Sequence, residues 1–298
     1  MELAVNFSPA LARLLEAGDV EVDRIKVPDW EELITAASAL RPIYVHFPYQ
    51  AGATIETVEP ERAARLLRET GTRLLNLHVA PSRERFPEIA VDDVSPAAKR
   101  AVVDALVQDV EVAKAALAAG SNQAEEPTGA AGATLPEVPA VAAGATLPEV
   151  PAVAIENLIY RGPDRSLLRA GVEPDVLHAV IDATGCALVL DLSHARISAE
   201  ALGVDPWRYL DAMPVAALRE LHMTGVHRIG DESKDHLPLL DDDWRFFEGA
   251  LARIAAGAWA PPDVVAFEYG GVGPVFDWRS EPEVLRDQVP RLLERVHA

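Results

Sequence analysis

Histidines and carboxylates recur in this sequence at the ends of short apolar runs. Six runs of the kind found in buried strands each end in at least one such residue. Imidazole nitrogen and carboxylate oxygen together suit zinc, iron and manganese. The seven residues are His46, His78, Glu156, Asp191, His194, His222 and Glu268. Their repeated occurrence at one place in the pattern predicts a metal centre.

The number of potential ligands exceeds the need of one ion, which takes about four to six. His236, in the expected loop after the run that ends in His222, adds an eighth. We therefore expect about two or three divalent ions per chain, Fe, Zn or Mn, with Glu156 as the bridging carboxylate. Asp235 directly precedes His236, and the sequence leaves open which of the two is the ligand.

Clustered ions would polarise a bound oxygen, lower the pKa of a bound water or activate dioxygen. Within the set, Glu156, His222 and Glu268 are the expected catalytic residues. Lys26, at the end of RIKV, is predicted to contact an anionic substrate group, with a snorkelling surface lysine as the alternative. Asn157 reaches the site only if its strand bends, and His227 contacts substrate or lies in a solvated loop.

Eight strand candidates alternate with helical patterns along the chain. They are apolar on both faces, as parallel strands covered by helices are. The expected strands are 2–7, 23–28, 43–47, 74–79, 152–158, 187–192, 218–223 and 264–269. The expected helices are 29–40, 95–119, 173–184, 205–212, 242–256 and 281–296, with Asp29 and Ser95 as capping residues of the first two.

This alternation predicts an α/β fold, a (β/α)8 TIM barrel that forms a single domain over residues 1–298. All strand C-termini of such a barrel open on one face, where the predicted ligands would converge. No GxGxxG follows the first strand, which counts against a dinucleotide site.

A 12-residue segment, AGATLPEVPAVA, occurs twice without change, at 131–142 and 143–154. Two copies are too few for a stacked repeat architecture. We expect residues 120–150 to form an exposed loop insertion that contains this duplication, with a lid over the site as the alternative.

Composition narrows the function classes. The chain has 47 acidic and 27 basic residues, a net charge of -20, and such a field opposes nucleic-acid binding. The single Cys186 excludes an intramolecular disulfide and is expected to be a buried, inert thiol. The N-terminus has no signal-peptide pattern, and no run approaches the roughly 20 apolar residues of a membrane span. We expect a cytoplasmic protein that acts on a small molecule or peptide.

The order His, His, Glu, Asp-x-x-His, His, His, Glu resembles that of the xylose isomerase-like TIM barrels, which include sugar isomerases, epimerases and the endonuclease IV type of nuclease. LDLSHARISAEALGVD is similar to the endonuclease IV segment that supplies an Asp and a His to its metals. That resemblance implies that Asp191 and His194 are ligands, with His46, His78, Glu156, His222, His236 and Glu268 in the other positions.

A closer resemblance covers about residues 155–240. IENLIY, LDLSHARISAEALGVD and LRELHMTGVH are similar to the DUF692 family. The resemblance implies a multinuclear iron-dependent oxidase that modifies ribosomally made peptides, often with a partner protein that presents the peptide. Two features depart from that family. Its usual Asp-x-His is replaced by Lys234-Asp235-His236, and its Asn-Asn after the strand-six Asp is replaced by Ser193-His194.

These observations predict a metal-dependent enzyme with three alternative reaction classes. The first is iron-dependent oxidative modification of a peptide or small thiol. The second is a sugar or polyol isomerase or epimerase, against which the surplus of histidine counts. The third is a phosphodiesterase of the endonuclease IV type, for which duplex DNA is disfavoured by the net charge. Metal storage without catalysis is the non-enzymatic alternative.

Overall fold

The structure is a computed structural model that describes residues 1–53, 59–123, 152–273 and 279–298. The expected insertion at 120–150 lies outside the described residues, except that its first four residues belong to the end of a helix. The second copy of the duplicated segment is described only from Ala152, where it enters a strand.

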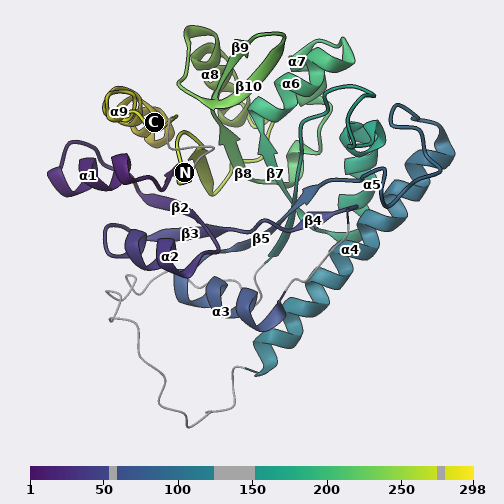
Figure 1. Cartoon of the computed structure of the whole chain (residues 1–298), viewed down its shortest axis with the longest axis horizontal. Helices are drawn as coiled ribbons and strands as arrows, with labels where there is room; N and C mark the ends of the chain where they lie inside the picture. Colours follow the sequence, from purple (N-terminus) through teal and green to yellow (C-terminus); the bar gives the residue numbers. More distant parts are fainter. Residues whose placement is uncertain (54–58, 124–151, 274–278) are drawn as a thin grey trace.

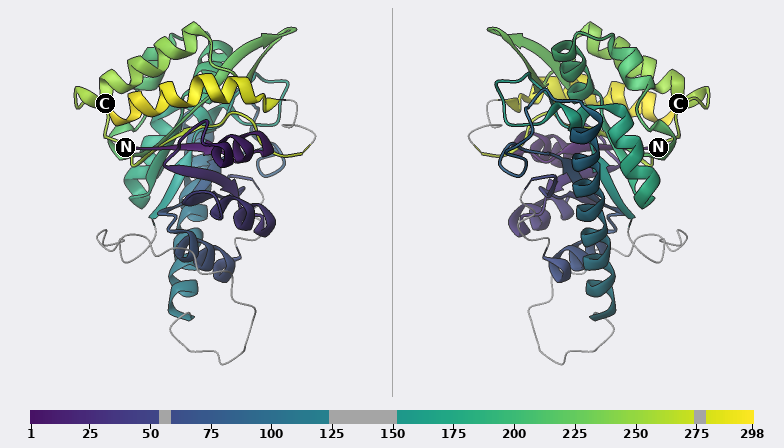
Figure 2. Two further views of the ribbon diagram at one scale, coloured as in Figure 1. Left: turned by 90° about the vertical axis from the view of Figure 1, so that its left-hand side faces the viewer. Right: turned by 90° about the vertical axis from the view of Figure 1, so that its right-hand side faces the viewer.

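A curled parallel sheet with helices around it forms the body of the molecule (Figures 1 and 2). Its strands are β1 Glu2–Asn6, β2 Arg24–Pro28, β3 Ile43–His46, β4 Gln50–Ala51, β5 Leu74–Val79, β6 Ala152–Glu156, β7 Ala187–Asp191, β8 Leu218–Met223 and β11 Val264–Phe267. The order is β3-β2-β1-β11-β8-β7-β6-β5-β4, and every ladder is parallel. Strands β3 and β4 are successive parts of one barrel position, which confirms the predicted TIM-barrel fold.

Side chains close the ring between β3 and β5. The Val45 amide donates to Thr72 Oγ1 (2.8 Å) and the Phe47 amide donates to Asn76 Oδ1 (2.7 Å). Asn76 Nδ2 in turn donates to the Phe47 carbonyl (3.0 Å). Only further along does β4 pair with β5 by a regular ladder. We call this stretch the seam; it lies beside the ends of β3 and β5, from which His46 and His78 project.

Nine α-helices lie in the described part of the chain. They are α1 Pro9–Ala17, α2 Glu31–Ser38, α3 Pro60–Thr70, α4 Pro96–Gln123, α5 Pro174–Thr184, α6 Leu192–Leu202, α7 Pro206–Asp211, α8 Asp241–Ala255 and α9 Pro282–His297. All six expected helices are present, while α1, α3 and α6 were not expected. Their buried apolar residues pack against the outside of the sheet and form one main core with it. Within the described residues, no helix combines the length and apolarity that crossing a membrane requires.

Two local expectations about helix starts have different outcomes. Ser95 Oγ accepts from the Ala98 amide (3.3 Å), so its capping role at α4 is confirmed. The expected cap at Asp29 is wrong, because Trp30 occupies the N-cap of α2 and makes no side-chain cap bond. The Asp29 carboxylate pairs instead with Arg62 (2.6 Å), a partner from α3 that the local sequence does not reveal.

Strand β7 passes into α6 without a loop. Asp191 is both the last residue of β7 and the N-cap of α6, where its Oδ1 accepts from the His194 amide (2.8 Å). The first helical turn therefore holds Asp191 and His194 close together at the C-terminal end of the barrel.

An unexpected antiparallel hairpin follows β8. It consists of β9 Gly225–Ile229 and β10 Glu232–Leu237, and its register shifts between Lys234 and Leu237. His236, inside that shift, has a φ of 56° and is the one non-glycine residue with positive φ in the described chain. The hairpin stands above the ends of β7 and β8, near α6 and α8 (Figure 1).

Candidate metal centre

The first group of potential ligands joins β3, β5 and β6. His46 Nε2 lies 3.3 Å from Glu156 Oε2, and His78 Nε2 lies 3.5 Å from the same oxygen. The two imidazole nitrogens are 3.2 Å apart. Glu156 is buried, whereas both histidines are partly exposed. Two nitrogens and one oxygen therefore converge on one point from three neighbouring strand ends.

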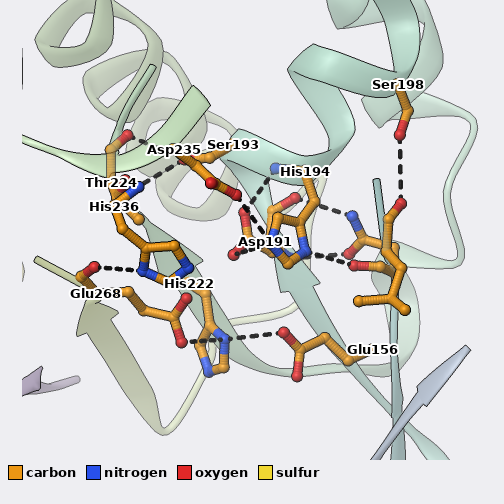
Figure 3. Close-up of polar contacts among 12 residues, drawn as sticks. Glu156, Asp191, Ser193, His194, Ser198, His222, Thr224, Asp235, His236 and Glu268 are labelled. Atoms are coloured by element: carbon orange, nitrogen blue, oxygen red, sulfur yellow. Dashed lines mark hydrogen bonds and ion pairs between the residues drawn. The ribbon is translucent and has the colours of Figure 1, made fainter. Parts of the chain in front are cut away.

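The second group lies deeper and consists of Glu156, Asp191 and His222, all buried. His222 Nδ1 is 3.4 Å from Glu156 Oε1 and 3.2 Å from Glu268 Oε1. Glu156 thus belongs to the first group through one carboxylate oxygen and faces the second through the other. Figure 3 shows Glu156 and Glu268 on either side of His222.

The third group is formed by His194, Asp235 and His236 (Figure 3). His194 Nε2 lies 3.3 Å from Asp235 Oδ2 and 3.6 Å from Asp191 Oδ2, which connects this group to the second. In extended backbone, neighbouring side chains point to opposite faces. The positive φ of His236 breaks that alternation, so Asp235 and His236 both belong to the group.

Hydrogen bonds fix which nitrogen of four imidazoles faces the groups. Three of them hold Nδ1 against a backbone carbonyl, which can only accept, so Nδ1 carries a proton and, once the imidazole is neutral, the lone pair lies on Nε2. The pairs are His78 with Tyr49 (3.0 Å), His194 with Asn157 (2.9 Å) and His236 with Glu268 (2.8 Å). In His222 the roles are reversed, since Nε2 contacts Glu220 Oε2 (3.3 Å) and Nδ1 faces Glu156.

Asp191 provides a separate test of whether a metal fits. Its side chain is fully buried, and Oδ2 has no hydrogen-bond partner among the described residues. An unsatisfied buried carboxylate oxygen costs free energy, and a cation beside it would remove that cost. The available lone pairs of the histidines and this oxygen fit divalent ions with mixed nitrogen and oxygen ligands.

The electrostatics of the third group also favour a cation. Burial opposes the charged form of His194, but the carboxylates of Asp191 and Asp235 outweigh it and raise the pKa of His194 to about 10. A site that holds a proton so firmly attracts positive charge. Because a metal needs the neutral imidazole, ion binding here would release that proton.

Lys26 adds a buried cation to the second group. Its ammonium pairs with Glu268 and lies 3.4 Å from His222 Nδ1. Burial lowers the pKa of Lys26 to about 8, although the carboxylates of Glu156, Glu220 and Asp191 oppose the shift. The predicted contact of Lys26 with an anionic substrate group stays a prediction; in this structure its partner is a carboxylate of the protein itself.

The other two residues predicted to contact substrate have structural partners. Asn157 donates to the Asp191 carbonyl (2.9 Å) and accepts from the Asp191 amide (2.8 Å), which ties the end of β6 to β7. His227 Nε2 lies 2.7 Å from the Pro238 carbonyl, within the hairpin region. Their roles in substrate binding stay predictions.

Sequence reasoning did not identify Glu220, the partner of His222. Both residues are on β8, two positions apart, and therefore share one face of the strand. That spacing was the signal that could have revealed it. Three arginines beside the third group, Arg161 and Arg165 after β6 and Arg279 before α9, carry no such signal.

Comparison with protein families finds a match in the C-terminal half of the chain. Residues 152–258 match the model of a family described as RiPP precursor modification enzyme MbnB/TglH/ChrH, where RiPP denotes a ribosomally made, modified peptide. A UPF0276 protein of Caulobacter vibrioides (strain NA1000 / CB15N) is 34% identical over 89 residues, which cover 28% of this chain and 31% of that protein. A second UPF0276 protein of this strain is 32% identical over 120 residues, 39% of this chain and 41% of that protein.

These matches span less than half of the length of the curated relatives. Among solved structures, D-psicose 3-epimerase crystallised in the presence of D-fructose has a TM-score of 0.50 and 12% identity, covering 99% of this chain and 97% of that one. That likeness concerns the fold alone. The expected resemblance to the DUF692-type family is confirmed: residues 152–258 are similar to the MbnB/TglH/ChrH family, and the fold is shared with a TIM-barrel protein of known structure.

Proposed function

We propose that this chain is a metal-dependent enzyme that uses a cluster of about two or three iron ions to modify a peptide oxidatively. One observation carries the proposal. The segment that matches the peptide-modification family, 152–258, contains six of the eight residues that make up the three groups. The matched part of the sequence is thus the part that supplies most of the potential metal ligands.

The three groups would hold the ions, with Glu156 between the first and the second. When bound, clustered iron supplies Lewis acidity, as zinc also would. Iron in addition supplies one-electron chemistry with dioxygen, and zinc has no such redox chemistry. The protein contributes imidazoles whose metal-facing nitrogen is set by the hydrogen-bond partners described above. His194 would release its second proton when an ion binds. Lys26 holds a proton at Nζ beside His222 and Glu268, inside the protein and away from bulk water.

Burial differs between the groups and indicates where substrate would approach. The second group is enclosed, since Glu156 is 1% exposed and both Asp191 and His222 are 0% exposed. Asp235 and His236 in the third group are partly exposed. The two histidines of the first group are also partly exposed. Substrate would therefore meet the first or the third group from solvent, while the second group stays shielded.

A partner protein that presents the peptide is part of the proposal and rests on the family resemblance. Sugar isomerisation and phosphodiester hydrolysis remain alternatives, and no observation on this chain favours either above peptide modification. The likeness to D-psicose 3-epimerase supports only the shared fold, at 12% identity.

Metal counting after anaerobic reconstitution tests the proposal. We expect about two or three iron ions per chain and a visible absorption band. Replacing the bridging residue, Glu156→Gln, should remove at least one ion, because that carboxylate is shared by two groups. Glu248→Gln is the matched control, since Glu248 is an exposed residue of α8. Retention of zinc alone, or failure to take up metal, would contradict the proposal.

A further inference from the structure

A cavity of about 350 Å³ opens beside the third group. Asp235 and His236 form part of its wall. The rest of the described lining is charged and consists of Arg161, Arg165, Lys234, Arg279 and Glu232. Four side chains with positive charge thus surround a space that has two potential metal ligands on its wall.

The four cations come from three different segments. Arg161 and Arg165 follow β6, Lys234 is on β10, and Arg279 precedes α9. Such loops at the C-terminal face of a barrel are where TIM-barrel proteins bind their substrates. Because the whole chain has a net charge of -20, this cavity is a local reversal of sign.

Contacts hold two of the arginines in place through neutral acceptors. Arg161 Nη1 donates to the Ser233 carbonyl (2.6 Å), which orients the guanidinium without cancelling its charge. Arg279 Nη1 donates to the Asp235 carbonyl (3.1 Å), which fixes this side chain next to the third group.

The remaining charges leave a positive balance. Arg165 pairs with Glu232, so these two largely cancel. Asp235 faces His194 at 3.3 Å and is engaged in the third group. Lys234 forms no ion pair with any described residue. Arg161 and Lys234 therefore provide charge that an anionic ligand can use.

We propose that this cavity binds a carboxylate or phosphate group of the substrate and thereby places the adjoining part of the substrate against Asp235 and His236. A guanidinium presents paired N–H donors that match the oxygens of both groups. The proposal rests on the proposed function, because it treats the third group as part of the reacting centre. It adds a substrate class, a molecule with an anionic oxygen group near the atom that reacts.

Calorimetric titration of the metal-free protein tests this binding separately from catalysis. The probes are acetyl-trialanine with a free C-terminal carboxylate, the same peptide as its C-terminal amide, and inorganic phosphate. We expect the free acid or phosphate to bind at least about tenfold more tightly than the amide, since hydrogen bonds to charged groups are the stronger ones. The tighter of the two anions identifies the group.

Variants locate the binding. Arg161→Gln and Lys234→Gln should each lower the affinity for the anion by about tenfold. Arg219→Gln removes the same charge from an exposed position at the start of β8, at the opposite end of the barrel, and should leave the affinity unchanged. Equal binding of acid and amide without phosphate binding, or an unchanged affinity in both variants, would overturn the proposal.

Iron counts on the same proteins after anaerobic reconstitution separate this proposal from the proposed function. Anion binding without iron uptake would support the cavity and count against the iron enzyme. Iron uptake without anion binding would do the reverse. Thermal melting of each variant shows whether a lost affinity reflects lost folding.

Discussion

Asp191 uses its two carboxylate oxygens for different purposes. Oδ1 caps helix α6 by accepting from the His194 amide, and Oδ2 faces the groups without a hydrogen-bond partner among the described residues. One oxygen of Asp191 thus stabilises helix α6, and the other is available to bind a metal ion. The Asp-x-x-His spacing made this pair visible in the sequence, although it did not reveal that a helix starts at the aspartate.

Substitution at Asp191 can separate these two purposes. Asp191→Asn keeps an oxygen for the cap but removes the charge, so we expect near-native stability with about one metal ion fewer per chain. Asp191→Ala also loses the cap, which should lower the free energy of unfolding by about a further 1 kcal/mol. Denaturant unfolding and elemental analysis measure the two effects. A full metal complement in Asp191→Asn would show that Oδ2 binds no ion.

At the scale of elements, hairpin β9–β10 positions Asp235 and His236, between which the sequence left the choice of metal ligand open. Its strands, GVHRI and ESKDHL, lack the apolar alternation that identifies a strand, so the segment was expected to be a loop. The choice between Asp235 and His236 could not be made either, because a left-handed histidine has no signature in the sequence. Helix α6 was missed for a related reason: no turn residues separate it from β7.

The backbone of His236 predicts an unusual order of stability. At φ 56° glycine is unstrained and valine is strongly disfavoured. We expect His236→Gly to unfold no more easily than the native chain, and His236→Val to lose about 1–2 kcal/mol. Both changes should reduce metal binding by the third group.

Urea unfolding of these variants supplies the measurement. Lys234→Val, two residues earlier on β10 and without positive φ, is the control for a valine in this strand. If the two valine variants were equally stable, the strain assigned to position 236 would be absent.

At the scale of the whole molecule, the barrel was the most predictable feature. Eight short apolar runs, six of them with a potential ligand at the C-terminal end, are enough to predict that sequence-distant residues such as His46 and Glu268 meet. In the structure both residues contact His222. The arginine-lined cavity could not be predicted, because its residues come from three segments with no common spacing. The closure of the ring by Thr72 and Asn76 was equally hidden, since it depends on side chains that replace a backbone ladder.

The seam makes the whole barrel sensitive to one amide side chain. Asn76→Ala removes the partners of the buried Phe47 amide and carbonyl, so we expect a loss of about 2–4 kcal/mol in the free energy of unfolding. Asn6→Ala is the control, because the one side-chain hydrogen bond of Asn6 within the described residues is a 3.5 Å contact with the Gly270 carbonyl. Urea unfolding measures both losses. Equal losses in the two variants would show that the hydrogen bonds of Asn76 with Phe47 do not contribute the stability assigned to them.

The seam has a further consequence for the local stability of the barrel. His46 and His78 lie on the two sides of the seam. An ion bound by both would cross-link β3 and β5 where the backbone ladder is interrupted. Removing the ion would leave the Thr72 and Asn76 side chains to keep the ring shut. The amide protons of Val45 and Phe47 would then exchange with deuterated water faster than those of β7 and β8. Local unfolding of the barrel would thus begin at the seam, beside the first group of potential ligands.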